Sequence, residues 1–194
     1  MKKILLNTLF KKEIAEFHKT EKELIWKIKN IEKNAEKQIE EVKRNSAIAE
    51  RIFNLFDDAE IIGIEENKFE KVYVFKKQKG SSLDIFLCSQ TYQAINGLPR
   101  ILTTINYKKR DGIDQKNIKI DDIQTVDIDL GNGSILMKYL IKLAKAQKVS
   151  SITGWLSSVD QNHFDRSEHY YEKFEFDVKF NNDRSEGSIK LDIL

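Results

Sequence analysis

Residues 131–147 read GNGSILMKYLIKLAKAQ, and residues 169–176 read HYYEKFEF. In the first stretch two glycines mark a turn, and the apolar residues that follow are spaced by one, three and four positions, as on one broad face of an amphipathic helix. A glycine turn that opens a helix presents backbone N–H groups that can hold a phosphate. Around these two stretches, residues 118–180 predict strand, turn, helix, strand, helix and strand.

Short runs rich in β-branched and aromatic residues fill the segment before this turn, and further runs follow it. Gly, Asn, Asp and Pro residues, including Asp111-Gly112, separate the runs as in an antiparallel meander. The strands on either side of the helix after the glycine turn should be parallel, because a helix crosses over between them. We therefore predict an α+β fold, a mixed sheet flanked by helices. The expected strands are 60–63, 71–77, 82–89, 100–108, 119–129, 151–155, 177–181 and 188–193, and the expected helices are 134–147 and 164–174.

The N-terminal segment has a different pattern, with no glycine or proline before Gly63. Two interleaved series of positions, each repeating every seven residues, run from Phe10 to Phe56, and eleven of their fourteen positions are apolar. This pattern is typical of a coiled coil, and a helix of this span would be about 70 Å long. We expect a long helix at residues 1–56 that forms a homodimer through residues 10–56, followed by a domain at 57–194. The alternative is that the helix folds back on its own domain or forms an antiparallel hairpin.

The composition limits the classes of partner. The net charge is +2, from 33 basic and 31 acidic residues, and Lys alternates with Glu along the N-terminal segment, so we do not expect nucleic acid as a ligand. No apolar run approaches the roughly 20 residues that cross a bilayer, so we expect no membrane partner. A single cysteine, Cys88, excludes an intramolecular disulfide framework and fits a reducing, cytoplasmic location.

The order of elements expected between residues 70 and 194 resembles the fold of the GNAT superfamily of N-acetyltransferases, including members from Firmicutes and their phages. In that family the fourth strand and the following turn, Gln/Arg-x-x-Gly-x-Gly/Ala, hold acetyl-CoA. Ile128 takes the place of the Gln or Arg in this chain. The resemblance implies that the cofactor-binding residues are Val126, Ile128, Gly131, Asn132, Gly133, Ser134 and Ile135.

The second stretch resembles the family sequence Tyr-Glu-Lys-Leu-Gly-Phe, here Tyr171 to Phe176. Family members often use this tyrosine as the general acid for the departing CoA thiolate, so the resemblance implies that role for Tyr171. Glu175 replaces the family's glycine, so the turn after this helix lacks the residue that best tolerates a positive φ.

A polar segment at residues 157–166 separates the two stretches. An amine must lose a proton to attack a thioester, and a carboxylate or histidine can accept it. Asp160 and His163 are therefore candidate catalytic residues at the mouth of the parallel strands. The alternative is a solvated loop in which Asp165 caps the next helix. One of four further aspartates could also be the base, and the sequence does not choose among Asp121, Asp122, Asp127 and Asp129.

We expect no metal site. His163, Asp165 and His169 could face one another, but three ligands without a cysteine or a further carboxylate are few for zinc. The expected function is acetyl-CoA-dependent transfer of an acetyl group to an unidentified amine. The alternative is a GNAT-like interaction module without catalysis, assembled through the coiled coil, and the replacements at Ile128 and Glu175 favour it.

Overall fold

The computed structural model describes residues 2–110 and 113–193, and it divides into two compact units, Met1–Ala47 and Ile48–Leu194. The second unit begins before the boundary expected after residue 56, because Ile48, Ile52 and Phe56 are buried in its core. The Asp111-Gly112 turn lies outside the described residues.

The N-terminal segment forms one helix, α1 (Lys2–Leu55), as its lack of glycine and proline predicts. We call the positions of the two interleaved seven-residue series the seam of this helix. The apolar seam residues from Phe10 to Val42 are exposed. Among the helices that the structure describes, none combines the length and hydrophobicity that crossing a bilayer requires.

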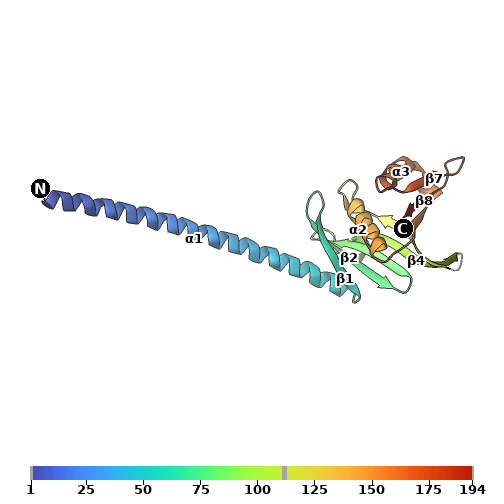
Figure 1. The fold of residues 1–194 in the computed structure, drawn as a ribbon, viewed down its shortest axis with the longest axis horizontal. Helices are drawn as coiled ribbons and strands as arrows, with labels where there is room; N and C mark the ends of the chain where they lie inside the picture. The colour runs from blue at the N-terminus through green and yellow to red at the C-terminus, as the bar shows by residue number, and fades with distance from the viewer. Residues whose placement is uncertain (1, 111–112, 194) are drawn as a thin grey trace. The chain divides into compact units, whose positions relative to one another are not determined.

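The described part of the second unit contains one sheet of eight strands, in the order β1-β2-β3-β4-β5-β6-β8-β7 (Figure 1). Strands β5 and β6 are parallel, and the other neighbouring strands are antiparallel. Helix α2 joins the two parallel strands, so the predicted α+β class and the parallel crossover are confirmed. The strands are β1 (Ala59–Glu66), β2 (Lys71–Lys79), β3 (Ser82–Cys88), β4 (Arg100–Arg110), β5 (Ile113–Gln124), β6 (Ser151–Leu156), β7 (Asp177–Phe180) and β8 (Gly187–Asp192), and the helices are η1 (Ile95–Gly97), α2 (Asn132–Ala146), η2 (Ser158–His163) and α3 (Phe164–Glu172).

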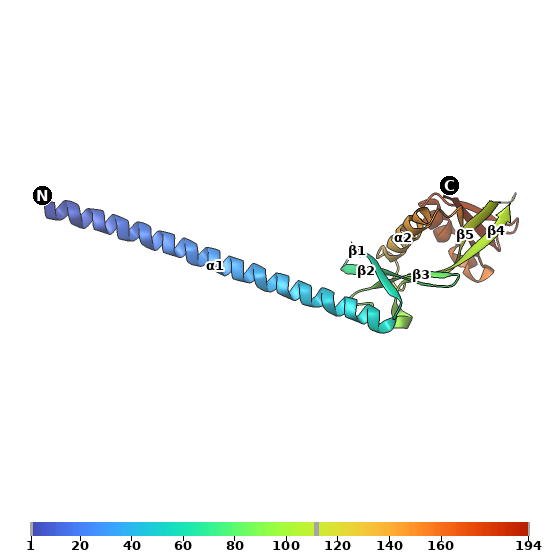
Figure 2. The ribbon, with the colours of Figure 1, turned by 60° about the horizontal axis from the view of Figure 1, so that its bottom comes forward.

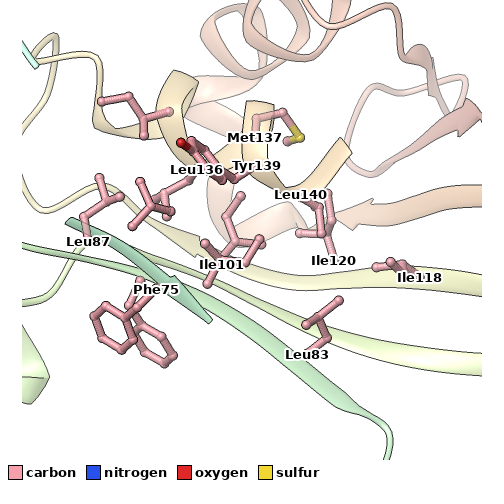
Figure 3. Packing of buried hydrophobic residues seen from close by; sticks show 14 of the residues in the cluster. Phe75, Leu83, Leu87, Ile101, Ile118, Ile120, Leu136, Met137, Tyr139 and Leu140 are labelled. Atoms are coloured by element: carbon pink, nitrogen blue, oxygen red, sulfur yellow. The ribbon is translucent and has the colours of Figure 1, made fainter. Parts of the chain in front are cut away.

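The core lies on both faces of the sheet. Figures 2 and 3 show α2 on one face, where Leu136 and Leu140 pack over the strands near Ile101. On the other face, Phe75 and Phe86 stack with their ring centroids 5.1 Å apart. Phe56, which directly follows α1, lies 5.1 Å from Phe86 and covers this pair. The end of α1 therefore belongs to the folded domain.

One expected strand ends early. Residues 119–129 were expected to be extended, but β5 ends at Gln124 and is followed by a loop, 125–131. Its last ladder partner is Arg100, the first residue of β4, so the chain beyond Gln124 has no partner strand on that side. Val126 and Ile128, expected on the strand, therefore lie in this loop.

Candidate functional site

The site begins where the two parallel strands stop pairing. Strand β5 pairs with β6 from Asn117–Ser151 to Ile120–Gly154, and each strand then continues without the other. Strand β5 runs on to Gln124, and within the described residues its register with β6 does not extend beyond Ile120. Such an open strand segment can bond to an extended ligand that carries amide groups.

A β-bulge lies at the same point. Leu102 of β4 pairs with Asp122, but its neighbour Thr103 pairs with Ile120, so Asp121 is an extra residue in β5. A bulge leaves the extra residue out of the ladder and redirects side chains, and bulges are frequent beside active sites. Asp121 accepts hydrogen bonds from Thr104 Oγ1 at 2.6 Å and from Lys119 Nζ at 2.9 Å. Asp122 accepts one from Gln124 Nε2 at 2.8 Å.

The start of α2 combines several features that favour an anion. Gly131 has φ of +90°, a conformation that suits glycine. The first N–H groups of a helix lack intrahelical acceptors, and the helix dipole places positive charge there. Lys173, just after α3, donates to Ser134 Oγ at 3.1 Å and adds a full positive charge beside this turn. The turn could therefore hold a phosphate group.

Gly133 has close neighbours on two sides. A Cβ at this position would lie 3.1 Å from Thr125 Cγ2 and 3.3 Å from Tyr170 Cε2, which is tighter than ordinary packing. The Tyr170 hydroxyl donates to the Gly133 carbonyl oxygen at 2.7 Å. Helix α3 is thus tied directly to the first turn of α2.

Asn132 was expected to contact the cofactor, and in the structure its side chain holds the turn in place. Its side chain is 1% exposed, accepts from Asn67 Nδ2 at 3.0 Å, and donates to Tyr92 Oη at 2.7 Å and the Thr125 carbonyl at 3.3 Å. Tyr92 in turn donates to Asp127 Oδ2 at 3.0 Å. The amide therefore fixes the turn against two other loops, and only the backbone N–H of Asn132 remains for a ligand.

Apolar side chains surround the turn. Val126, Ile128 and Phe69 are exposed by 52%, 62% and 78%. Their loops are joined by the Lys68 N–H, which donates to the Leu130 carbonyl at 3.2 Å. Val126 has φ of 63°, an uncommon and strained conformation for a β-branched residue. Ile135 is buried in the core, so its side chain is not accessible for the expected contact with a cofactor.

Tyr171 lies in α3 and is buried. Its ring is 8% exposed and packs edge-on against Tyr170 and Phe176, with centroids 5.2 and 5.5 Å away. Burial first, and then the charges of Asp122 and Asp160, hold the pKa of Tyr171 far above its usual range. Within the described chain its hydroxyl makes no hydrogen bond to protein, so it remains a protonated donor without a partner.

The polar segment after β6 contributes less than expected. The charge of Asp160 adds to the raised pKa of Tyr171, whereas the side chain of the exposed His163 makes no hydrogen bond or ion pair within the described ranges. Asp165 does not cap α3. It pairs with Arg184 at 2.7 Å, as Glu168 does at 2.6 Å. Across residues 2–110 and 113–193, no three His, Cys, Asp or Glu side chains are placed to hold a metal ion.

Sequence reasoning missed Lys173, Tyr170 and the particular importance of Asp122. Lys173 and Tyr170 are both within the quoted 169–176 stretch, but only the packing of α3 against α2 brings them to the glycine turn. Asp122 is distinguished from the other three aspartates by its effect on the pKa of Tyr171, which no local pattern in the sequence indicates.

Comparison with known proteins gives one relative in sequence. No family model matches the chain. The chain is 33% identical over 144 residues to "Uncharacterized protein YocC" of Bacillus subtilis (strain 168), covering 73% of this chain and 81% of that protein. Among solved structures, a crystal structure of a domain from Methanocaldococcus jannaschii DSM 2661 gives a TM-score of 0.36 at 16% identity, over 59% of this chain and 69% of that domain.

Proposed function

We propose that this chain, which belongs to the same family as YocC of Bacillus subtilis, is a GNAT-type N-acyltransferase that uses acetyl-CoA. The proposal rests on how the parallel strands, the glycine turn and two side chains are arranged. The parallel strands β5 and β6 stop pairing beside a bulge, a glycine turn and helix join them, and the charge of Asp122, next to the bulge residue, helps to raise the pKa of the buried Tyr171. This combination supplies a place for an extended phosphate-bearing thioester and groups that act on an attacking amine.

The start of α2 fits the anionic part of acetyl-CoA. The first N–H groups of the helix, Ser134 and Lys173 would hold the pyrophosphate. The open backbone of β5 beyond Ile120 would bond to the amides of the pantetheine arm. When bound, acetyl-CoA supplies a thioester whose acyl carbon accepts a nucleophile.

Asp122 is the best candidate for the base among the four aspartates. Asp127 accepts from Tyr92, Asp121 is held by Thr104 and Lys119 on the bulge, and Asp129 lies in the loop beyond the end of β5. Asp122 accepts from Gln124 of its own strand, and it is the one of the four whose charge helps to raise the pKa of Tyr171. As an amine nitrogen bonds to the acyl carbon, Asp122 accepts the amine proton and the carbon–sulfur bond breaks, leaving a thiolate.

Tyr171 would stabilise that thiolate by donating a hydrogen bond. A thiol has a pKa of about 8.5, and the pKa of Tyr171 lies far above this value. Complete transfer of the tyrosine proton to the thiolate would therefore be unfavourable, and solvent supplies the final proton. This proposal changes the expected role of Tyr171 from proton donor to hydrogen-bond donor.

The test is release of free CoA thiol by the full chain in the presence of acetyl-CoA and amines of several classes. We expect Asp122→Asn to lower kcat by about 100-fold or more and Tyr171→Phe to lower it by about tenfold. Asp192→Asn, an exposed change on β8, is the matched control and should leave the rate unchanged. Equal rates for Asp122→Asn and Asp192→Asn would contradict the assigned base.

The second candidate is an interaction module without catalysis. The exposed Ile128, where the family has Gln or Arg, favours it together with the neighbouring exposed Phe69. It predicts that no amine raises thiol release above that of acetyl-CoA alone.

The assembly and location belong to the same proposal. The exposed seam of α1 would join two chains into a homodimer through a coiled coil. The seam's end, from Ile48, packs in the domain core, so the coiled coil would end before that residue rather than at residue 56. The buried free thiol of Cys88 agrees with a reducing cytoplasm.

A further inference from the structure

The first unit exposes a continuous apolar seam that its own residues do not cover. Of the ten seam positions from Phe10 to Val42, eight are apolar. Burying an aliphatic or aromatic side chain removes roughly 60–120 Å² from water. Seven of the eight are larger than alanine, so a pair of helices would contribute fourteen such side chains. Burying them would remove on the order of 1,000 Å² from water, close to the roughly 1,200–2,000 Å² that specific interfaces bury. The seven larger apolar residues, which are 53–67% exposed, are Phe10, Ile14, Phe17, Leu24, Ile28, Ile31 and Val42.

The spacing of the seam defines the heptad positions. Phe10 and Ile14 are four residues apart, and Ile14 and Phe17 are three apart. In a heptad, d precedes the next a by four residues and a precedes d by three, so Ile14 begins the a series and Phe10 the d series. The flanking g positions are then 13, 20, 27, 34 and 41, and the e positions are 11, 18, 25, 32, 39 and 46.

A shallow depression of about 240 Å³ lies on this helix surface, lined by Phe17, Thr20, Glu21, Leu24 and Ile25. The first four occupy successive d, g, a and d positions. Four residues of this kind form the hole that receives one side chain of a facing helix in a coiled coil. The depression therefore fits a second α1 helix.

The flanking residues favour parallel helices in register. In that arrangement each g residue lies beside the e residue five positions later on the other chain. Lys27 would lie beside Glu32 of the second copy, and Glu13 beside His18. Of the other g residues, Thr20 and Asn34 are uncharged and would lie beside isoleucines, and Glu41 would lie beside Ser46. None of these flanking pairs therefore joins two like charges.

The antiparallel alternative over the same residues is less favourable. It places g residues beside g residues, so Lys27 would face its own copy and Glu13 would face Glu41. Like charges at such distances repel. We therefore infer that residues 10–42 of two copies of this chain form a parallel, in-register, two-stranded coiled coil. The inference rests on the proposed self-association and does not depend on acyl transfer.

Glu21 is the weak position of this pairing, because it occupies an a position where two copies would face each other. In the single chain its carboxylate lies 3.2 Å from His18 Nδ1 on the seam's edge. Replacing it with leucine adds two apolar side chains to the interface. We expect Glu21→Leu to lower the dimer dissociation constant by at least about tenfold.

The test is disulfide trapping of the full chain carrying Gln38→Cys, at a d position where the parallel arrangement brings the two copies together. A disulfide needs Cβ atoms about 3.5–4.5 Å apart, so oxidation should give a covalent dimer. Lys33→Cys, on the outer surface of the helix, is the matched control and should not crosslink. The wild-type chain, whose Cys88 is buried, gives the background. Light scattering on the reduced wild-type chain should give twice the chain mass of 22.7 kDa.

Three results would overturn the inference. One is a mass that stays at that of a single chain at every concentration. Another is a mass of three or more chains. The third is an antiparallel result, in which Gln38→Cys crosslinks to an Ile14→Cys chain but not to itself. None of these results would bear on thiol release by the second unit, so the two proposals fail separately.

Discussion

Replacing Asn132 by alanine should destabilise the second unit by about 3 kcal/mol. Its side chain, 1% exposed, makes hydrogen bonds to Asn67, Tyr92 and the Thr125 carbonyl. Each such bond contributes about 0.5–1.5 kcal/mol, and a buried partner left unpaired costs about 1–3 kcal/mol more. Asn67 and Tyr92 are 8% and 3% exposed, so water replaces the amide poorly.

Urea unfolding of the full chain measures this change. Trp26→Phe is introduced in all variants so that only Trp155, in the second unit, reports by fluorescence. With a slope of about 2 kcal/mol per molar urea, a loss of about 3 kcal/mol lowers the midpoint by about 1.5 M. Asn162→Ala, at an exposed position in η2, is the control and should change stability by less than about 0.5 kcal/mol. A midpoint for Asn132→Ala equal to that of the control would refute the assigned hydrogen-bond network.

Two further changes test the backbone and the electrostatics. Glu175 is exposed with φ of 66°, so Glu175→Gly should raise the free energy of unfolding by about 1 kcal/mol. Glu172→Gly, in α3, should instead lower it by about 1 kcal/mol. Destabilisation by both changes would exclude strain at Glu175. The hydrogen bond from Lys138, opposed by burial, lowers the pKa of Glu65 below 4.5. The ionised carboxylate therefore stabilises the fold above pH 4.5, and this stabilisation is lost as the pH falls through the lower pKa of Glu65 in the folded state. Urea unfolding from pH 7 to pH 3 should therefore show a stability difference between wild type and Glu65→Gln that shrinks in acid, and a difference independent of pH would contradict the ion pair.

The elements of the fold could be predicted where the pattern is local. The seven-residue repeat gave α1, and the apolar spacing after Gly133 gave α2 within two residues of its ends. The turn at Glu175 was also visible, and its φ of 66° agrees with a position that suits glycine. These features depend on residues close together in the chain.

The contacts that shape the candidate site depend on residues far apart. Asn132 is 65 residues from Asn67 and 40 from Tyr92, so its structural role could not be read from the turn alone. The bulge at Asp121 exists only in the register between β4 and β5. Strand β5 ends at Gln124 because its partner β4 begins at Arg100. The local sequence does not show this limit, so Val126 and Ile128 were expected on the strand.

The most direct test of the central claim is calorimetric titration of acetyl-CoA into the full chain and two lysine variants. Lys173, just after α3, contacts Ser134 at the start of α2, and Lys145 lies in the last turn of α2. The account predicts micromolar binding that Lys173→Ala weakens by about tenfold or more, because a charge-assisted contact to phosphate is lost, and that Lys145→Ala leaves unchanged. No heat at millimolar acetyl-CoA, or equal binding by the two variants, would contradict a phosphate site at this turn.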